Sequence, residues 1–270
     1  MIPLTLILSR KGRGDVDGGV IMQQVKPWHE DDSFWQTWGP FMFGAQRIAD
    51  AVEEVTKIAK LLNIQPGASI LDLGCGIGRI SLEFARRGFR VTGVDRTIRY
   101  LEQARQQAEK ENLNVEFIHS DMRAFMRPDA FDSVVSMYTT FGYFENQADD
   151  RRVVNNIYIS LKPAGTVLID IHGKETLAKI FQERQWSERE GAILLQEHKV
   201  IQNWSWMQTR WILLKGNDRI ESNFSHRLYS GTEMAALLTG CGFSRADIYG
   251  SFDGIPYDHL ARRLVAVGRK

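Results

Sequence analysis

Three glycines follow a short apolar run in the segment "ILDLGCGIGRI", which spans residues 70–80. Gly74, Gly76 and Gly78 stand where a predicted strand ends and a helix begins, and glycines at alternate positions let a ligand come close to the backbone. One use of such a loop is to bind a phosphate through backbone amides. The dinucleotide pattern G-x-G-x-x-G would place its third glycine at position 79, where the chain has Arg79. The loop therefore indicates a bound ligand but departs from the dinucleotide pattern.

An aspartate lies at or near the end of each of the first three predicted strands. Asp72 stands two residues before the first glycine, where its carboxylate can face an ammonium group of a ligand. Asp95 can accept hydrogen bonds from both hydroxyls of a ribose, and Asp121 can accept one from an adenine amino group, with the Met122 amide near the ring. Taken singly, each acid is as well explained by a turn or a helix cap. Together with the glycine loop, the three predict an adenosyl ligand that lacks phosphates and carries an amine and a positive centre, as S-adenosylmethionine does.

The same segments resemble the motifs of class I S-adenosylmethionine-dependent methyltransferases. They are, in chain order, "LDLGCGIGR", "VTGVD", "HSDMR", "FDSVVSMYTTFGYF" and "LKPAGTVLIDI". The resemblance covers residues 68–171 and, more loosely, the last helix and two strands, whose sequence looks like that of a bacterial group acting on small molecules. Ala164 stands where these enzymes usually have a glycine. The resemblance implies a seven-stranded sheet with an antiparallel last strand, and S-adenosyl-L-homocysteine as the product.

The resemblance also assigns a set of residues to the cofactor, most of them in the loops that follow the first four strands. Cys75 is expected to contribute its backbone alone, with an inert side chain. The predicted cofactor-binding residues are Asp72, Gly74, Cys75, Gly76, Asp95, Arg96, Asp121, Met122, Met137 and Tyr138.

Methyl transfer needs little from the protein besides alignment of the reacting atoms and exclusion of water, because the cofactor supplies the leaving group. A general base is required only where the nucleophile arrives protonated. His172, after the fifth strand, is the preferred base or polar orienting group, and Tyr143 is the second residue assigned to catalysis, although an isolated histidine is more often structural. The residues assigned to the substrate are Thr140, Arg227, Tyr229 and Tyr257.

The elements that must position these residues follow from the hydrophobic pattern. Continuous apolar strands alternating with amphipathic helices predict a doubly wound, mostly parallel α/β sheet. The predicted strands are 69–73, 90–94, 115–118, 132–137, 165–171, 245–250 and 263–268, and the predicted helices are 46–64, 78–88, 97–111, 150–161 and 230–240.

Four segments of the chain are distinguished by composition and pattern: 1–22, interpreted as a disordered leader; 23–172, the cofactor-binding α/β domain; 173–228, an insertion; and 229–270, a return to that domain. Residues 190–229 alternate in the manner of antiparallel strands, so the insertion is interpreted as an antiparallel β subdomain that forms a lid or a subunit interface. By this alternation Trp204 and Trp206 share one face and Trp211 takes the other. The tryptophan-rich segment 28–38 is expected to cover the cofactor or to brace the fold.

Composition narrows the function classes. A formal net charge of +1 argues against a nucleic-acid surface, and the fourth motif lacks the Asn/Asp-Pro-Pro-Tyr form of enzymes that methylate adenine or glutamine nitrogens. Two distant cysteines, Cys75 and Cys241, give neither a disulfide framework nor a zinc spacing and suit a cytoplasmic protein. No metal site and no membrane segment are predicted. The leading hypothesis is methyl transfer to an oxygen or nitrogen of a small molecule.

Three alternatives remain at the level of sequence. One is a nicotinamide-dependent dehydrogenase, which Arg79 and the lack of a placeable tyrosine–lysine pair disfavour. A second is a non-catalytic protein that binds an adenosyl ligand. The third is a methyltransferase acting on RNA or protein. Homo-oligomerisation through the β insertion is compatible with any of these.

Overall fold

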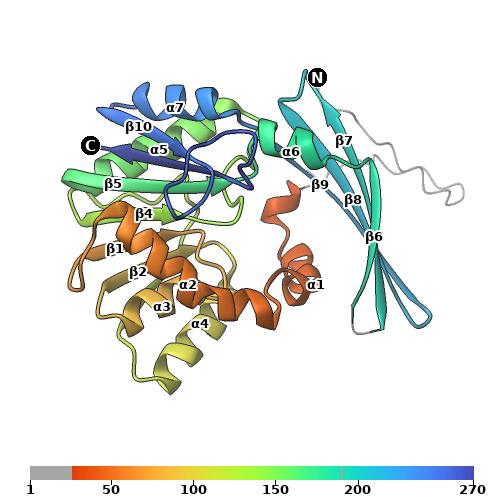
Figure 1. The fold of residues 1–270 in the computed structure, drawn as a ribbon. Coiled ribbons are helices and arrows are strands. Elements are labelled where there is room, and N and C mark those ends of the chain that lie inside the picture. The colour runs from red at the N-terminus through yellow and green to blue at the C-terminus, as the bar shows by residue number, and fades with distance from the viewer. Residues whose placement is uncertain (1–25, 190) are drawn as a thin grey trace, which may run out of the picture.

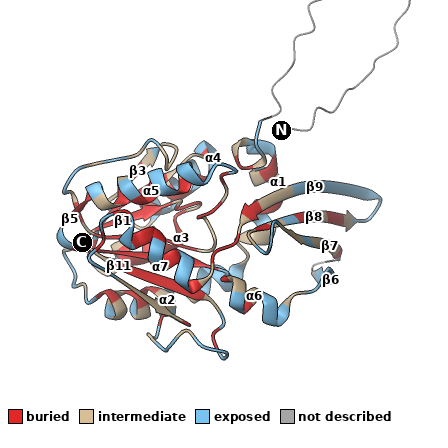
Figure 2. Cartoon of the chain, turned by 90° about the horizontal axis from the view of Figure 1, so that it is seen from above, coloured by how far each residue is buried: buried red, intermediate tan, exposed pale blue. Residues whose placement is uncertain are grey.

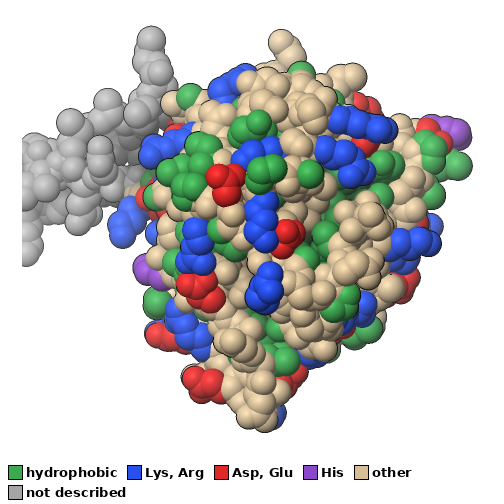
Figure 3. All heavy atoms as spheres, turned by 90° about the vertical axis from the view of Figure 1, so that its left-hand side faces the viewer, with side chains coloured by type: hydrophobic (Ala, Val, Ile, Leu, Met, Phe, Trp, Pro, Cys, Tyr) green, Lys and Arg blue, Asp and Glu red, His purple; other side chains and the backbone are tan. Residues whose placement is uncertain are grey.

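The computed structural model describes residues 26–189 and 191–270. The predicted leader, residues 1–22, lies outside this part of the chain. None of the described helices is long and apolar enough to cross a membrane. On the face turned away from the inserted sheet, basic and acidic side chains are intermixed rather than gathered by sign (Figure 3).

A seven-stranded sheet forms the centre of the molecule (Figure 1). Its spatial order is β10-β11-β5-β4-β1-β2-β3, and β11 alone runs in the opposite direction to the other six strands. The strands, with their bounds, are β1 (Ser69–Leu73), β2 (Arg90–Asp95), β3 (Val115–His119), β4 (Phe131–Ser136), β5 (Leu161–Ile171), β10 (Arg245–Tyr249) and β11 (Leu264–Arg269). The predicted fold class, including the antiparallel last strand, is confirmed.

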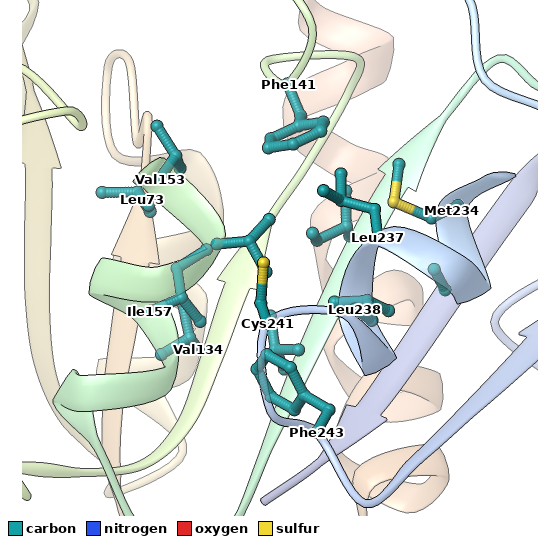
Figure 4. Close-up of a cluster of buried hydrophobic side chains, with 14 of the residues drawn as sticks. Leu73, Val134, Phe141, Val153, Ile157, Met234, Leu237, Leu238, Cys241 and Phe243 are labelled. Carbon is teal, nitrogen blue, oxygen red and sulfur yellow. The ribbon is translucent and has the colours of Figure 1, made fainter. Parts of the chain in front are cut away.

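Helices cover both faces of the sheet, so its central strands are buried on both sides (Figure 2). One face packs on α2 (Ala45–Leu62), α3 (Arg79–Arg86) and α4 (Ile98–Lys110). The other face packs on α5 (Gln147–Ser160) and α7 (Gly231–Thr239), whose apolar side chains meet those of β4 and β5 in the cluster of Figure 4. Alternate residues of one strand point to opposite faces.

The order of the strands reverses between β1 and β4, which pair in parallel with Leu71 opposite Val134. From β1 the chain builds outward through β2 to β3, and it then returns to β4 on the other side of β1. In open parallel sheets, ligands bind beyond the carboxyl ends of the strands at such a reversal. The fold thus places the glycine loop after β1 beside the segment that follows β4.

A second sheet of four antiparallel strands is inserted between β5 and α7. It is the meander β6 (Arg184–Arg189), β7 (Ala192–Ile201), β8 (Trp206–Lys215) and β9 (Asp218–Arg227), preceded by α6 (Lys174–Ile180). In register, His198 of β7 stands opposite Thr209 of β8, which stands opposite Phe224 of β9. The inner face of this sheet, to which these three belong, is turned toward the main sheet and packs on α1 (Asp32–Met42) (Figure 1).

The structure departs from the sequence prediction in the insertion and before the main sheet. The strand β6 and the short helix α6 of the insertion were not predicted. Neither was α1, which contains Pro40 and an aromatic-rich pattern without clear periodicity. The prediction that Trp204 shares a face with Trp206 is wrong, because Trp204 lies in the turn between β7 and β8, where residues 202–204 have positive φ. Trp206 and Trp211 do lie on opposite faces of β8, as predicted.

The predicted cap of α7 is present, and it gives a stability prediction. The Ser230 hydroxyl accepts from the Glu233 amide, and the Glu233 carboxylate accepts from the Ser230 amide in return. Replacing Ser230 with alanine is expected to lower the free energy of unfolding by about 1 kcal/mol, because one amide at the start of the helix loses its partner. Urea unfolding measures the difference; an unchanged midpoint would mean that the cap adds nothing to stability.

Candidate active site

A cavity of about 460 Å³ lies between the carboxyl ends of β1, β2 and β4, the helix α1 and the inner face of the inserted sheet. Every predicted cofactor-binding residue contributes to its wall. Thr140, Tyr143 and His172, which were assigned to the substrate or to catalysis, contribute as well. The structure therefore brings the two groups of residues to one continuous space.

The glycine loop after β1 is closely packed. Gly74 has φ +80°, and a Cβ atom added to it would lie 2.1 Å from Cγ2 of Thr140, in the loop after β4. Gly76 has φ +55°, and an added Cβ would lie 3.0 Å from Cζ of Phe43. Both positions thus need a glycine for conformation and for space. The bare backbone that results forms part of the cavity wall, which suits a ligand that approaches the main chain.

Asp95 is held in place by the same loop. One of its carboxylate oxygens accepts from the Gly76 amide at 2.8 Å, and the other accepts from the Thr97 amide at 2.8 Å. Burial raises the pKa of Asp95. Since a carboxylate oxygen can accept more than one hydrogen bond, each oxygen retains capacity for a hydroxyl group. The arrangement fits the predicted contact with two ribose hydroxyls.

The other two acids differ in their surroundings. Asp72 is buried, accepts from the Ser81 hydroxyl at 2.6 Å, and has its pKa raised by burial to about 6. Both oxygens of Asp121 accept from Arg123, which also pairs with Glu30. Burial by itself would raise the pKa of Asp121, but the Arg123 hydrogen bonds outweigh it and the pKa is lowered. The carboxylate expected near adenine is thus partly occupied by an arginine that the sequence did not indicate.

Cys75 presents its backbone to the cavity and its side chain to the core beneath α4. Burial raises the pKa of its thiol, so the sulfur remains protonated at neutral pH. Arg96 donates to the backbone oxygen of His29 at 3.1 Å and therefore joins the loop after β2 to the segment that precedes α1.

A turn with unusual backbone conformation follows β4. Tyr138 and Thr139 have φ values of +58° and +56°, which cost non-glycine residues about 1–3 kcal/mol each. The buried Asp170 of β5 holds this turn: its carboxylate accepts from the Tyr138 amide at 3.0 Å and its backbone oxygen from the Thr139 amide at 2.9 Å. Sequence reasoning missed this role of Asp170, although an acid inside the apolar run "TVLIDI" was a visible signal.

The part of the cavity bordered by the inserted sheet, Trp28 and Tyr143 is here called the acceptor half. Trp28 packs against Tyr143, Trp35 and Phe224 with ring centroids 4.7, 5.6 and 5.4 Å apart. Its indole nitrogen donates to the backbone oxygen of Ser225 in β9 at 2.8 Å. The tryptophan-rich segment therefore connects the inserted sheet to the main domain and forms a wall of the acceptor half.

Three histidines from separate strands also border the acceptor half: His172 after β5, His198 in β7 and His226 in β9. His198 contacts Thr209 and Gln185 through its two ring nitrogens, at 3.0 and 3.1 Å. Burial lowers the pKa of all three histidines. The pKa of His226 falls to about 4, because the charges of His172 and His198 lower it in addition to burial. All three are therefore neutral at pH 7. The position of His198 was not predicted.

Three residues assigned to the substrate lie outside this cavity. Arg227 and Tyr229 both hydrogen-bond to one carboxylate oxygen of the fully buried Asp150, at 3.1 and 2.7 Å. Tyr257 donates to Glu175 at 2.8 Å. These side chains connect the ends of the insertion to the α/β domain, and their assignment to the substrate stays a prediction. Within the described ranges, no group of three or more histidine, cysteine or acidic residues is arranged to hold a metal ion.

The low pKa of His226 gives a pH prediction. Its folded-state pKa of about 4 lies below the value of 6.5 for an unperturbed histidine, so unfolding takes up a proton between these pH values. The stability that neutral His226 contributes is complete above pH 6.5 and is lost as the pH falls toward 4. From pH 7 to pH 5 the wild type should lose about 2 kcal/mol more than a His226→Gln variant.

Urea unfolding of both proteins at the two pH values measures this difference. A His259→Gln variant, altered at an exposed position, serves as the control. Parallel pH profiles of the wild type and His226→Gln would contradict the prediction.

Comparison with known proteins agrees with this geometry. Residues 70–165 match the family described as "Methyltransferase domain". The chain is 28% identical to YqeM of Bacillus subtilis, a protein named as a methyltransferase, over 74% of this chain and 83% of that one. Among solved structures, an S-adenosylmethionine-dependent methyltransferase from Clostridium acetobutylicum superposes with a TM-score of 0.71 at 13% identity, covering 88% of this chain and 98% of that one. The sugar N-methyltransferase KedS8 from Streptoalloteichus superposes with a TM-score of 0.64 at 17% identity, covering 96% and 99%.

Proposed function

We propose that this chain, an S-adenosylmethionine-dependent methyltransferase, methylates an oxygen or nitrogen of a small molecule bound in the acceptor half of the cavity. The observation that carries the proposal is the continuity of that cavity. Its one half is formed by the glycine loop and the strand-end acids, and its other half by aromatic side chains and neutral histidines. When bound, S-adenosylmethionine supplies a methyl group on a positively charged sulfur.

The residues around the glycine loop fit this cofactor. Asp95 would bind the ribose, and Asp72, with Gly74 and Gly76, would surround the methionine portion. Met122 and Asp121 would flank the adenine, with Asp121 shared between the ring and Arg123. None of these groups needs to react, because their task is to fix the donor and to keep water away from it.

His172 is the proposed base. It follows β5, and its side chain borders the acceptor half. Burial lowers its pKa, so the imidazole is neutral at pH 7 and can accept a proton from the attacking group. Burial raises the pKa of Tyr143, so its phenol stays protonated and can donate a hydrogen bond to the substrate. We therefore assign Tyr143 to orienting the substrate and His172 to proton transfer.

A small molecule suits the acceptor half better than a polymer does. The wall formed by α1 and the segment before it closes one side, and the inner face of the inserted sheet closes another. An RNA or a protein would have to pass these elements to reach the glycine loop.

The test is a search for the acceptor. Purified protein and S-adenosylmethionine are incubated with pools of small metabolites, with total RNA and with cell protein, and each is examined by mass spectrometry for the gain of one methyl group. Modification of a small molecule that a His172→Ala variant slows supports the proposal. Modification confined to RNA or protein would contradict it, and so would tight cofactor binding without any transfer, the result expected of a non-catalytic binding protein.

A further inference from the structure

Two buried polar atoms on the inner face of the inserted sheet lack a hydrogen-bond partner among the described residues. They are the indole nitrogen Nε1 of Trp211 in β8 and the imidazole nitrogen Nε2 of His226 in β9. Both residues border the cavity, and His226 is only 7% exposed. Buried polar groups in folded proteins are nearly always paired, and an unpaired one costs about 1–3 kcal/mol. A substrate in the acceptor half is the natural partner for both.

The two atoms require different hydrogen-bond partners. An indole N–H can only donate, so Trp211 requires an acceptor such as a carbonyl or ether oxygen. The imidazole of His226 is neutral at pH 7, as described above, and Nε2 accepts from a hydroxyl when the ring proton is on Nδ1. His226 of β9 stands opposite Met207 of β8, and Met207 is four residues before Trp211 on the same strand. The backbones of His226 and Trp211 are therefore about 13 Å apart along the strand direction. A ligand that reaches both side chains is therefore extended rather than compact.

The charges around the cavity restrict the ligand further. Among the residues that the structure describes, the carboxylates of the cavity wall come from Asp72, Asp95 and Asp121 alone, all in the half that surrounds the cofactor. The remaining charged side chains of the wall include Arg47 and Arg79. A cationic amine in the acceptor half would lose its hydration without gaining a counter-ion, which is strongly unfavourable. An uncharged molecule carries no such cost.

The aromatic walls indicate the shape of the ligand. Phe224 lies between Trp211 and His226 along β9 and packs on Trp211 with the rings 4.8 Å apart. Trp35 and Tyr143 contribute further rings to the wall. Such surfaces bind flat, apolar ring systems well.

We propose that the acceptor half recognises an uncharged, oxygen-bearing ring compound, with Trp211 donating to one of its oxygens and His226 accepting from its hydroxyl group. The proposal rests on the proposed function, because it names the substrate class of the same cavity. It makes Trp211 and His226 determinants of specificity, and it leaves the proton transfer to His172.

The test uses two probes of the same shape, 7-hydroxymethylcoumarin and 7-aminomethylcoumarin, of which only the second is a cation at pH 7. Their binding to the complex of the protein with S-adenosylhomocysteine is measured by calorimetry. The alcohol should bind at least tenfold more tightly than the amine. Trp211→Phe and His226→Phe should each weaken binding of the alcohol about five- to tenfold, which is the loss of one hydrogen bond, and leave the affinity for S-adenosylhomocysteine within twofold.

The matched control is Trp186→Phe, since Trp186 lies on the outer face of the same sheet with 68% of its surface exposed. Trp211→Phe keeps an aromatic ring at this position. If His226→Phe does not fold, the binding of the alcohol to Trp211→Phe is the result that tests the proposal. Equal or tighter binding of the amine, no detectable binding of the alcohol, or unchanged binding in the folded variants would overturn the proposal. Preference for the alcohol without methyl transfer to any compound would contradict the proposed function and leave this inference standing.

Discussion

An Asp95→Asn variant should bind S-adenosylmethionine at least 100-fold more weakly than the wild type. The carboxylate is fixed by the amides of Gly76 and Thr97, and each of its oxygens is available for a ribose hydroxyl. A hydrogen bond to a charged group contributes about 1.5–3 kcal/mol, and the variant lacks the charge and one of the two acceptor oxygens. Titration calorimetry with S-adenosylmethionine and with S-adenosylhomocysteine measures the change.

Asp218→Asn is the matched control, because Asp218 is an exposed residue at the start of β9, in the part of the inserted sheet outside the cavity. That variant should bind both compounds as the wild type does. If Asp95→Asn retained an affinity within threefold of the wild type, Asp95 would have no role in holding the donor, and the ribose contact would have to be assigned elsewhere.

Gly74→Ala should destabilise the protein by about 3 kcal/mol or more and weaken donor binding. The added methyl group meets two obstacles, a backbone at φ +80° and the Thr140 methyl group 2.1 Å away. The first costs about 1–2 kcal/mol and the second, as overpacking, about 1–3 kcal/mol. Relieving the overlap requires either moving the loop after β4, which borders the same cavity, or rotating Thr140 away from its hydrogen bond to Met137.

Two further variants separate these causes. Gly67 has φ +90°, and an added Cβ would meet nothing within 4 Å, so Gly67→Ala reports the backbone cost alone. Thr140→Ser removes the clashing methyl group and keeps the hydroxyl that donates to the Met137 backbone oxygen at 2.6 Å. In the Thr140→Ser background, Gly74→Ala should cost at least about 1 kcal/mol less than in the wild type and approach the cost of Gly67→Ala, with Cβ and Oγ1 of residue 140 still 3.2 and 3.4 Å from the added Cβ. An equal cost of Gly74→Ala in both backgrounds would show that the steric contact does not limit this position.

The main sheet could be predicted from sequence because its signal is local. Each buried strand is a continuous apolar run, each helix shows its own periodicity, and the capping box of α7 is legible in Ser230 and Glu233. The order of the strands determines where the loops after them lie, so the predicted cofactor residues come together once the sheet is formed.

The acceptor half could be predicted only in part, because its residues depend on long-range pairings. The sequence around Arg227 and Tyr229 does not indicate that both side chains will hydrogen-bond to Asp150, about 80 residues earlier in the chain. Trp204 follows the alternation of its neighbours, and only the turn between β7 and β8 removes it from the strand. The inward direction of His198 follows from the register of three strands, which the sequence of one strand does not determine.

The most direct measurement is a pair of calorimetric titrations, one with S-adenosylhomocysteine and one with NAD. If the main chain after β1 and the strand-end acids Asp72, Asp95 and Asp121 surround a nucleoside without phosphates, the thioether should bind one molecule per chain at micromolar concentration, and NAD should not bind at millimolar concentration. Binding of NAD with comparable affinity, or no binding of the thioether, would contradict the account.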